Sequence, residues 1–463
     1  MRKIELLLPA GDFSKLKTAF KYGADAVYFG GDEFSLRTAA GNFSVADVER
    51  ASEYSRELGK KIYLTANVIP HNVDIAVFRK FIAGIKHIPF DGIIISDLGM
   101  FDIAREELPD IDIHISTQAN TANYQSAKMW HKLGASRVIL ARELSFDEIR
   151  EIRDNTPETL ELEAFVHGAM CISYSGRCLL SNYMANRDGN SGSCAQPCRW
   201  NYHLHSADVS LECETSEADF SASKAEDADG LTPFKDDNAA GGKSETKGAL
   251  RNLRRHYALM EEQRPGEYLP VYENERGTYI FNSKDLCMIE YVDKLIESGL
   301  ASLKIEGRVK NEYYVATCAA VYRDAIDEYY KDPKNFKFNP DWLAELRKVS
   351  HRDYTTGFFF NRPGQKEQHY HSSSYIREYD LSGIVQSYDN ETKLAEILQK
   401  NRFFKGDTVE FLRPFGKFHV QTIEEMFDEN GVPIDVANKP LSIIKMKVDC
   451  ELEVGCVMRK QKN

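Results

Sequence analysis

The stretch Gly92-Ile-Ile-Ile-Ser96, followed by the helix-like residues 100–107, carries the pattern that decides the fold. A short run that is apolar almost throughout predicts a strand covered on both faces, which is typical of parallel sheets. The same pairing recurs on both sides of this stretch. The predicted strands are residues 4–8, 26–29, 61–66, 92–96, 112–116, 137–140, 160–166 and 302–305. Such an α/β pattern predicts a TIM-like (β/α)8 barrel, with a doubly wound open sheet as the alternative.

The barrel is expected to occupy residues 1–338, with a long insertion before its eighth strand. The insertion, at about residues 206–256, is acidic, rich in Ser, Ala and Gly and short of apolar residues, so we expect it to be disordered. After it, residues 283–287 are expected to start a helix, and residues 351–360 to form a connector. Short strands such as 394–398, 408–412 and 447–453 predict a small C-terminal β-barrel domain over residues 339–463.

The composition is ordinary for a globular protein, with 42% hydrophobic and 28% charged residues. No apolar run approaches the roughly 18 residues of a membrane span, and no signal peptide is visible, so we expect no membrane association. Nine cysteines, an odd number, indicate reduced thiols and a cytoplasmic protein. The net charge of −12 argues against a broad nucleic-acid-binding surface but allows a local basic track.

One such track is predicted in the C-terminal part, where residues 400–405 and 413–417 interleave cations with aromatic side chains. This mixture can stack bases and neutralise phosphates. The alternative is a solvated edge strand whose phenylalanines belong to the core.

Four of the nine cysteines fall within residues 171–198. Thiolates prefer soft metal centres, so the expected guest is an iron–sulfur cluster or a structural zinc ion. Structural zinc favours closely spaced cysteine pairs, and only Cys194-Ala-Gln-Pro-Cys198 has that form, whereas a cluster tolerates the wider spacing of Cys171 and Cys178. Buried cysteines that bind nothing are the remaining alternative.

Polar and charged residues follow the predicted strands and are expected to line a pocket at the carboxyl end of the barrel. They are Asn67, Asp97, Ser116, Thr117, Gln118, Arg142, Glu143, His167, Lys304, Glu306 and Arg308. Each alone could be a helix cap or a surface charge. Their recurrence at successive strand ends favours a site.

Residues 163–181 contain Glu163-x-Phe165, Gly168-Ala-Met-Cys171, Gly176-x-Cys178 and Leu180-Ser181, and this pattern resembles the signature of the peptidase U32 family. Further blocks, Leu8-Pro-Ala-Gly11 and Lys304-Ile-Glu-Gly-Arg308 among them, resemble the same family in the expected order. The resemblance covers nearly the whole chain except about residues 206–256. The better-understood members of the family are oxygen-independent hydroxylases of RNA bases or quinone precursors, and they carry a 4Fe–4S cluster on four cysteines.

Within that family the chain most resembles the branch that converts the wobble uridine of tRNA to 5-hydroxyuridine, with prephenate as co-substrate. By this resemblance Cys171, Cys178 and Cys194 are cluster ligands. Cys287 is the expected fourth ligand, with Cys198 in reserve. The partners implied are tRNA, prephenate and an unidentified electron donor or partner subunit.

The expected catalytic residues, given this resemblance, are His167, Arg142, Glu306 and Arg308. The cations Arg142, Lys304 and Arg308 would suit a dicarboxylate such as prephenate. Two alternatives stand beside the hydroxylase. One is a collagenase-like U32 peptidase, with Cys171 near His167, and the other is a cluster-bearing RNA-binding partner without catalytic activity.

Overall fold

The computed structural model describes residues 3–31, 42–171, 173–174, 178, 180–181, 194–195, 197–199, 257–260, 268–274, 277–279, 283–361, 375–413 and 418–462. The chain divides into two compact units, one formed by residues 1–200 and 279–463 and the other by residues 201–278. The insertion predicted at about 206–256 lies outside the described residues.

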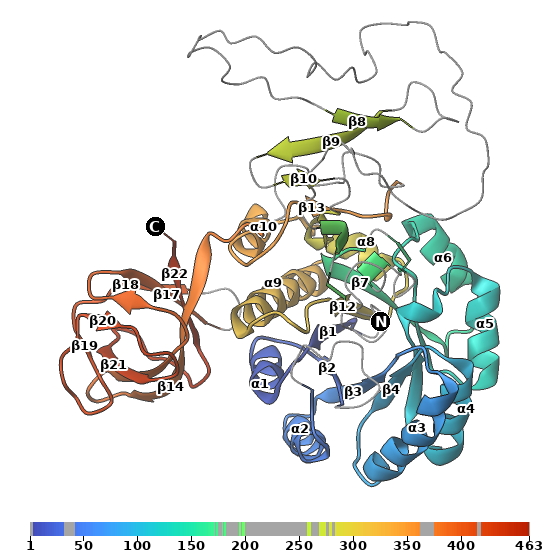
Figure 1. Ribbon diagram of the computed structural model, residues 1–463, viewed down its shortest axis with the longest axis horizontal. Coiled ribbons are helices and arrows are strands. Elements are labelled where there is room, and N and C mark those ends of the chain that lie inside the picture. The colour runs from blue at the N-terminus through green and yellow to red at the C-terminus, as the bar shows by residue number, and fades with distance from the viewer. Residues whose placement is uncertain are drawn as a thin grey trace, which may run out of the picture. The chain divides into compact units, whose positions relative to one another are not determined.

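Eight parallel strands close into a barrel in the first unit (Figure 1). They are β1 (Glu5–Pro9), β2 (Ala26–Gly30), β3 (Lys61–Ala66), β4 (Gly92–Ile95), β5 (Asp112–Ile115), β6 (Arg137–Ile139), β7 (Glu161–Ala169) and β12 (Ser302–Ile305). Each strand pairs with the next, and β12 pairs with both β7 and β1, which closes the ring. The predicted (β/α)8 barrel is therefore confirmed, and the open sheet is excluded.

Helices lie outside the strands and cover them (Figure 1). They are α1 (Phe13–Lys21), α2 (Val45–Glu57), α3 (Asn72–Ile85), α4 (Leu98–Glu107), α5 (Tyr124–Leu133), α6 (Phe146–Asp154), α8 (Val292–Glu297) and α9 (Glu312–Lys331), with short 3-10 turns η1 (Thr117–Ala119), η2 (Pro197–Arg199) and η3 (Ile289–Tyr291). Side chains satisfy their first N–H groups: Ser44 and Asp47 form a capping box on α2, and Ser145 and Glu148 form another on α6. Among the described helices, none has the length and apolar character needed to cross a membrane.

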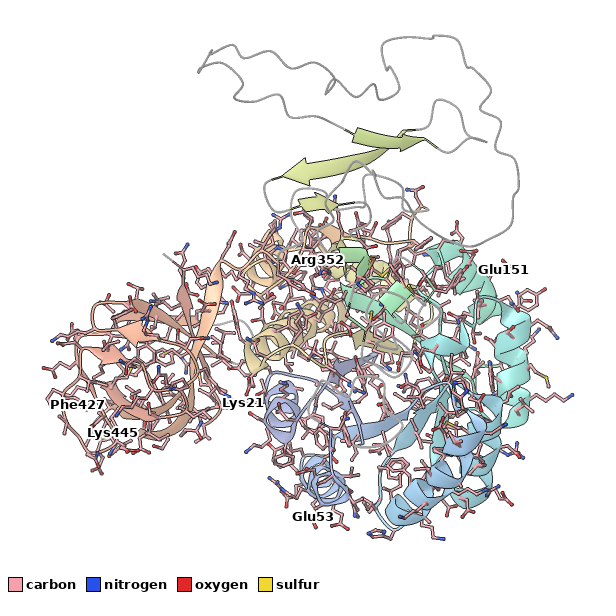
Figure 2. The ribbon with its side chains drawn as sticks, in the orientation of Figure 1. Lys21, Glu53, Glu151, Arg352, Phe427 and Lys445 are labelled. Atoms are coloured by element: carbon pink, nitrogen blue, oxygen red, sulfur yellow. The ribbon has the colours of Figure 1, made fainter. Side chains whose placement is uncertain are left out.

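Two short strands extend the sheet beyond the barrel. β11 (Asp285–Cys287) pairs antiparallel with β7, and β13 (Tyr354–Thr355) pairs with β11. The prediction that residues 283–287 start a helix is therefore wrong, because they add a strand to the edge of β7, and α8 begins only at Val292. Arg352, just before β13, ties the two strands together, since its N–H donates to the Asp285 carboxylate at 3.0 Å (Figure 2).

A curled antiparallel sheet forms the C-terminal part, as the predicted small β-barrel required, after helix α10 (Pro340–Leu346). Its order is β18 (Phe418–Thr422), β17 (Thr408–Leu412), β22 (Val457–Gln461), β14 (Tyr379–Asp389), β15 (Leu394–Gln399), β21 (Ile443–Lys447) and β19 (Met426–Phe427), and β16 (Phe403–Phe404) pairs separately with β20 (Val436–Ala437). The sheet encloses a core of its own. The strand predicted at 447–453 is wrong, since β21 ends at Lys447.

The C-terminal sheet and the barrel helices share buried polar contacts within the first unit. Tyr22 of α1 donates its hydroxyl to Leu412 O at 2.8 Å and accepts from Val457 N at 3.1 Å. Arg459 of β22 is fully buried and binds Glu345 of α10. On the surface, Lys21 reaches Glu453 at 2.6 Å (Figure 2).

The described part of the second unit belongs to a three-stranded sheet in which β8 and β9 are antiparallel. Its strands lie in the order β10 (Gly277–Tyr279), β9 (Tyr268–Asn274) and β8 (Tyr257–Met260). β8 and β9 pair from Tyr257 with Val271 to Met260 with Tyr268. This sheet follows the insertion in the chain.

The barrel interior holds a charged network rather than an apolar core alone. Arg137 binds Glu5 at 2.6 Å and Glu163 at 2.9 Å, and Lys304 binds Glu163 at 2.8 Å from the other side. Tyr63 donates its hydroxyl to Glu5 at 2.7 Å. All these side chains are buried, so each charge is balanced inside the barrel, as burial requires.

Candidate functional site

The carboxyl ends of the barrel strands carry the predicted polar residues, and several of them stabilise the fold. Asp97 caps α4 by accepting from Gly99 N at 2.8 Å. Ser116 caps η1 and accepts a hydrogen bond from Asn67 at 3.1 Å. Asp97 and Ser116 therefore act as helix caps, as the alternative reading of these strand ends required.

Arg142 joins the ends of β6 and β7. Its Nη1 donates to Ala169 O at 2.8 Å, and its Nη2 lies 3.9 Å from Cys171 Sγ. The guanidinium also lies over the Phe165 ring, 5.3 Å from its centre. A fixed cation thus stands next to the first sulfur of the segment that follows β7, residues 170–199, which we name the cysteine loop.

Glu306 and Arg308 follow β12 and are both buried. Glu306 N donates to His167 O at 2.8 Å, and Arg308 Nη1 donates to Thr65 at the end of β3, at 3.0 Å. The backbones approach closely here, since a Cβ on Gly168, whose φ is 113°, would lie 2.8 Å from Glu306 O. The two predicted residues therefore belong to one rigid segment at the barrel end, and Arg308 reaches strand β3.

Lys304 lacks the accessible position that a ligand-binding cation needs. It is buried in the barrel interior, binds Glu163 and stacks on Tyr28 at 4.4 Å. Burial lowers the pKa of Lys304, although the neighbouring Glu163 carboxylate opposes that effect. The ammonium group is thus committed to the interior network.

His167 is also buried, and three tyrosines enclose its ring. The ring centres of Tyr314, Tyr322 and Tyr354 lie 5.9, 5.6 and 5.5 Å away. Burial lowers the pKa of His167 to about 3, with smaller effects from His351 and Lys310. His167 is therefore a neutral side chain inside the protein, in a position suited to supporting the site rather than touching a substrate.

The cysteines of the loop are accessible to different degrees. Cys171 and Cys194 are exposed, and Cys178 and Cys198 are half-buried. Ser181 accepts a hydrogen bond from Ala195 N at 2.8 Å, which ties the two halves of the loop together. Cys171, two residues after β7, lies at the carboxyl end of the barrel.

Cys287 is buried on β11, directly opposite His167 of β7. Burial raises the pKa of its thiol to about 12, and Tyr322 is its hydrogen-bonding neighbour. Within the described residues, no three His, Cys, Asp or Glu side chains lie close enough to hold a metal ion. The donor chemistry of the loop fits a thiolate-bound centre, and Cys287 lies buried on the strand that pairs with the end of β7.

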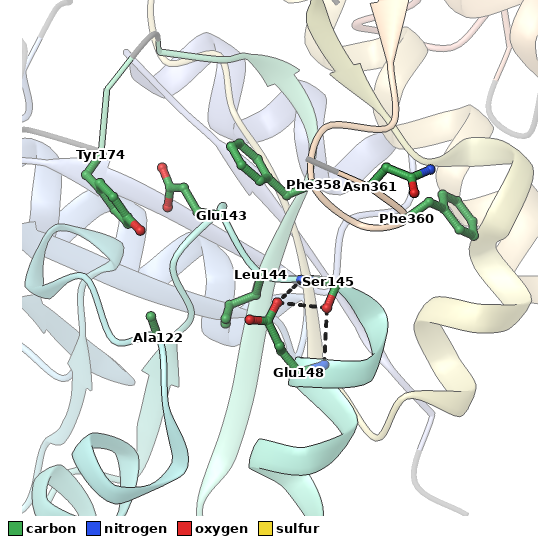
Figure 3. A pocket seen from close by; sticks show the side chains of 9 residues that line it. All are labelled: Ala122, Glu143, Leu144, Ser145, Glu148, Tyr174, Phe358, Phe360 and Asn361. Atoms are coloured by element: carbon green, nitrogen blue, oxygen red, sulfur yellow. Dashed lines mark hydrogen bonds between the residues drawn. The ribbon is translucent and has the colours of Figure 1, made fainter. Parts of the chain in front are cut away.

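A cavity of about 630 Å³ opens beside the loop (Figure 3). Glu143 and Leu144 line it from the end of β6, Tyr174 from the cysteine loop, and Phe358 and Phe360 from the segment after β13. The sequence placed Glu143 at a strand end but not among the catalytic candidates. For the aromatic residues that line the cavity, the sequence shows only the run Phe358-Phe-Phe360 within the expected connector.

The carboxyl group of Glu143 in this cavity has an unusual environment. Its Oε2 is buried and, in the part of the chain described, has no hydrogen-bond partner. Burial raises the pKa of Glu143, and the adjacent Arg142 charge opposes that rise. A carboxyl group with a raised pKa in a cavity is typical of functional sites.

The basic track of the C-terminal sheet is described in part. Phe403 is buried in the core of that sheet, while Phe404 is 40% exposed and has Arg402 at 5.4 Å and Lys460 at 5.6 Å from its ring centre. Residues 414–417 lie outside the described part. Phe403 therefore fits the alternative of a core phenylalanine, whereas Phe404 has the exposed aromatic and cationic surroundings of the predicted track.

Comparison with known proteins adds two family matches. The model of peptidase family U32 matches residues 11–369, and that of the peptidase family U32 C-terminal domain matches residues 377–459. The chain is 37% identical over its full length to "tRNA hydroxylation protein P1" of Bacillus subtilis (strain 168), covering 96% of that protein. It is 37% identical to "tRNA hydroxylation protein P" of Escherichia coli (strain K12), covering 99% of this chain and 97% of that one. A "Collagenase" of Porphyromonas gingivalis (strain ATCC BAA-308 / W83) is 28% identical, over 91% of this chain and 89% of that protein.

Proposed function

The chain belongs to peptidase family U32, and from that premise we propose that it is a tRNA-modifying enzyme that hydroxylates a base. Relatives named tRNA hydroxylation proteins match it from end to end. The observation that carries the proposal is the position of the cavity: Tyr174 of its wall lies in the cysteine loop, three residues after Cys171. A base turned out of its stack could therefore lie beside the sulfurs. We place this activity in the cytoplasm.

The finer proposal is the conversion of wobble uridine to 5-hydroxyuridine with prephenate as co-substrate. Prephenate is a dicarboxylate, and guanidinium groups bind carboxylates through paired hydrogen bonds. Arg142 and Arg308 stand at the carboxyl ends of β6 and β12, on the face where barrel sites form. Lys304 is not part of this proposal, because it binds Glu163 inside the barrel.

We further propose that Cys171, Cys178 and Cys194 hold a 4Fe–4S cluster. Bound there, the cluster would supply the electron transfer that hydroxylation needs. For the fourth ligand we propose Cys287, buried on β11 beside β7, with Cys198 of the cysteine loop as the alternative. Arg142 beside Cys171 would offset the negative charge of the thiolates.

These ligands can be separated by iron analysis after anaerobic purification. Cys287→Ser should lose bound iron and sulfide, and Cys198→Ser should keep them. The reverse result would make Cys198 the fourth ligand. Wild-type protein that contains only zinc, or no metal, would refute the cluster itself.

A peptidase would need a nucleophile with a base beside it. His167 is enclosed by tyrosines, and the cation next to Cys171 is Arg142. This geometry does not favour the collagenase-like alternative. A non-catalytic RNA-binding role predicts unchanged tRNA nucleosides in a strain that lacks this chain.

Mass spectrometry of tRNA nucleosides tests the function directly. In a strain lacking this chain, 5-hydroxyuridine and its derivatives should disappear, and the wild-type chain should restore them. Arg308→Gln should fail to restore them, whereas the surface variant Arg79→Gln should succeed. Unchanged tRNA nucleosides in the deletion strain would refute hydroxylation.

A further inference from the structure

Two carboxylates line the cavity beside the cysteine loop, and they are in different states. Glu148 is satisfied within the protein, because its Oε2 accepts from Ser145 N at 2.8 Å and from Ser145 Oγ at 2.7 Å (Figure 3). Glu143 has a buried Oε2 that no group of the described residues donates to. An ionised carboxylate only accepts hydrogen bonds, so a ligand that satisfies Glu143 must bring a donor.

The walls on either side of Glu143 are aromatic. In Figure 3 its carboxyl group is seen between Tyr174 and Phe358, and Phe360 lies farther along the same wall. Aromatic side chains stack on the face of any nucleobase, and a polar group then reads its edge. The volume of about 630 Å³ accommodates one nucleotide, not a base-paired stem. The occupant must therefore be a single base outside its stack.

We propose that this cavity binds the uracil base of the substrate and that the Glu143 carboxylate accepts the N3–H of its imide edge. This inference rests on the proposed function, which supplies uridine as the target. It adds the pocket and the specificity-determining residue. Cytosine has an acceptor at N3, which would face the carboxylate oxygen unfavourably. Glu143 therefore distinguishes the two pyrimidines by a hydrogen bond that only one of them can donate.

Burial of the Glu143 carboxyl group is consistent with this role. A buried acceptor without a donor is unfavourable, so the free protein carries an unsatisfied oxygen that a bound base would satisfy. The covering of Oε2 limits the water that can compete for a hydrogen bond to this carboxylate.

The test uses anticodon stem-loop RNA that carries either uridine or 3-methyluridine at the wobble position, bound to the full-length, anaerobically purified chain. Methylation removes the N3–H and leaves both carbonyl groups. The wild-type protein should bind the 3-methyluridine RNA about 10- to 100-fold more weakly, as measured by fluorescence anisotropy. Equal binding of the two RNAs would overturn the inference.

Variants separate a lost hydrogen bond from simple exclusion of the methyl group. Glu143→Leu should bind both RNAs with similar affinity, because it has no acceptor to lose. Glu143→Gln keeps an acceptor oxygen and should retain part of the discrimination. Glu151→Gln removes an exposed carboxylate of α6 (Figure 2) and should keep the wild-type ratio. If Glu143→Leu still rejects 3-methyluridine, the methyl group is excluded by shape and Glu143 does not read the base.

Circular dichroism of each variant shows whether it has folded. If Glu143→Leu does not fold, a Glu143→Gln variant that discriminates between the two RNAs as strongly as the wild type would refute the inference. The binding ratio is measured without turnover, so it is independent of the nucleoside analysis. Hydroxylation that depends on this chain together with equal binding of the two RNAs would refute only the role of Glu143. Unchanged nucleosides together with a clear binding preference would refute only the hydroxylase.

Discussion

Replacing Arg137 with methionine tests how the barrel interior is held together. The Arg137 side chain is 1% exposed and binds Glu5 at 2.6 Å, Glu163 at 2.9 Å and Glu161 at 2.5 Å. Breaking a buried ion pair costs about 3–5 kcal/mol, because the remaining charge stays buried without compensation. Glu163 would keep Lys304 at 2.8 Å, so Glu5 would bear most of the loss. We therefore expect the free energy of unfolding to fall by about 3 kcal/mol, the lower end of that range.

The loss should also depend on pH. Burial alone would raise the pKa of Glu5, but the charge and hydrogen bonds of Arg137 outweigh it, so the pKa lies below its ordinary value. A lowered pKa stabilises the fold above the unfolded-state pKa, and this stabilisation is lost as the pH falls through the folded-state pKa. In the Arg137→Met variant, burial is the main influence left on Glu5, so the pKa of Glu5 rises. Protonation of Glu5 then removes the uncompensated buried charge and part of the loss of stability. The difference in free energy of unfolding between wild type and Arg137→Met should therefore become smaller as the pH falls from about 7 to about 5.

Urea unfolding followed by circular dichroism at both pH values measures the effect. Arg79→Met is the matched control, since Arg79 also lies near two carboxylates, Glu106 and Glu107, each at 3.5 Å, but on the surface. Such exposed pairs contribute about 0–1 kcal/mol. A loss for Arg137→Met no larger than that of the control, or one that does not change with pH, would refute this account of the interior network.

Three further outcomes follow from the same structure. Gly168→Ala should lower the melting temperature and abolish tRNA hydroxylation, because φ is 113° and its Cβ would meet Glu306 O at 2.8 Å; unaltered melting and hydroxylation would contradict this. In cluster-free protein, iodoacetamide should modify Cys171 well before Cys287, whose thiol is buried with a pKa of about 12, and timed mass spectrometry checks the order. Arg459→Met should destabilise the protein by about 3 kcal/mol in urea, since, of the described cations, it leaves Glu345 and Glu410 with only the Lys348 ammonium group, at 3.2 and 3.7 Å; a wild-type midpoint would show that the Arg459 contacts are dispensable.

The barrel could be predicted because each of its strands has a recognisable apolar pattern in its own local sequence. Parallel strands covered on both faces must be apolar along their whole length, and helix caps such as Ser44 and Ser145 mark where the chain turns back. The predicted strand at residues 61–66 coincides with β3, and the helix-like residues 100–107 lie within α4. Local composition and tertiary packing agree in these elements.

Two misplaced elements show where local patterns fail. β11 has only three residues, which is too short to display a period, and its strand character comes from pairing with β7 across a long insertion. Residues 447–453 alternate apolar and polar side chains as a strand would, and Val448 and Leu452 are indeed buried. The chain buries them from a loop after β21, so alternation reports burial here and not backbone pairing.

The site was predictable only in the parts that lie close together in the sequence. Clustered cysteines mark their loop directly, whatever surrounds them. The cavity is different, because Glu143 and Phe358 come from strand ends and connectors far apart in the chain and meet only after the barrel closes. No periodicity in the sequence records that meeting.

The turn after β6 connects the two proposals physically. Arg142 contacts Ala169 O and Cys171 Sγ on the cysteine loop, and the next residue, Glu143, lines the cavity. A shift of this turn would move the cation away from the sulfur and the carboxylate away from its ligand together. The catalytic and recognition roles should therefore respond jointly to changes in the turn, while substitutions at Glu143 alone should alter base discrimination and leave iron binding intact. That separation places base recognition and cluster binding on neighbouring but distinct side chains.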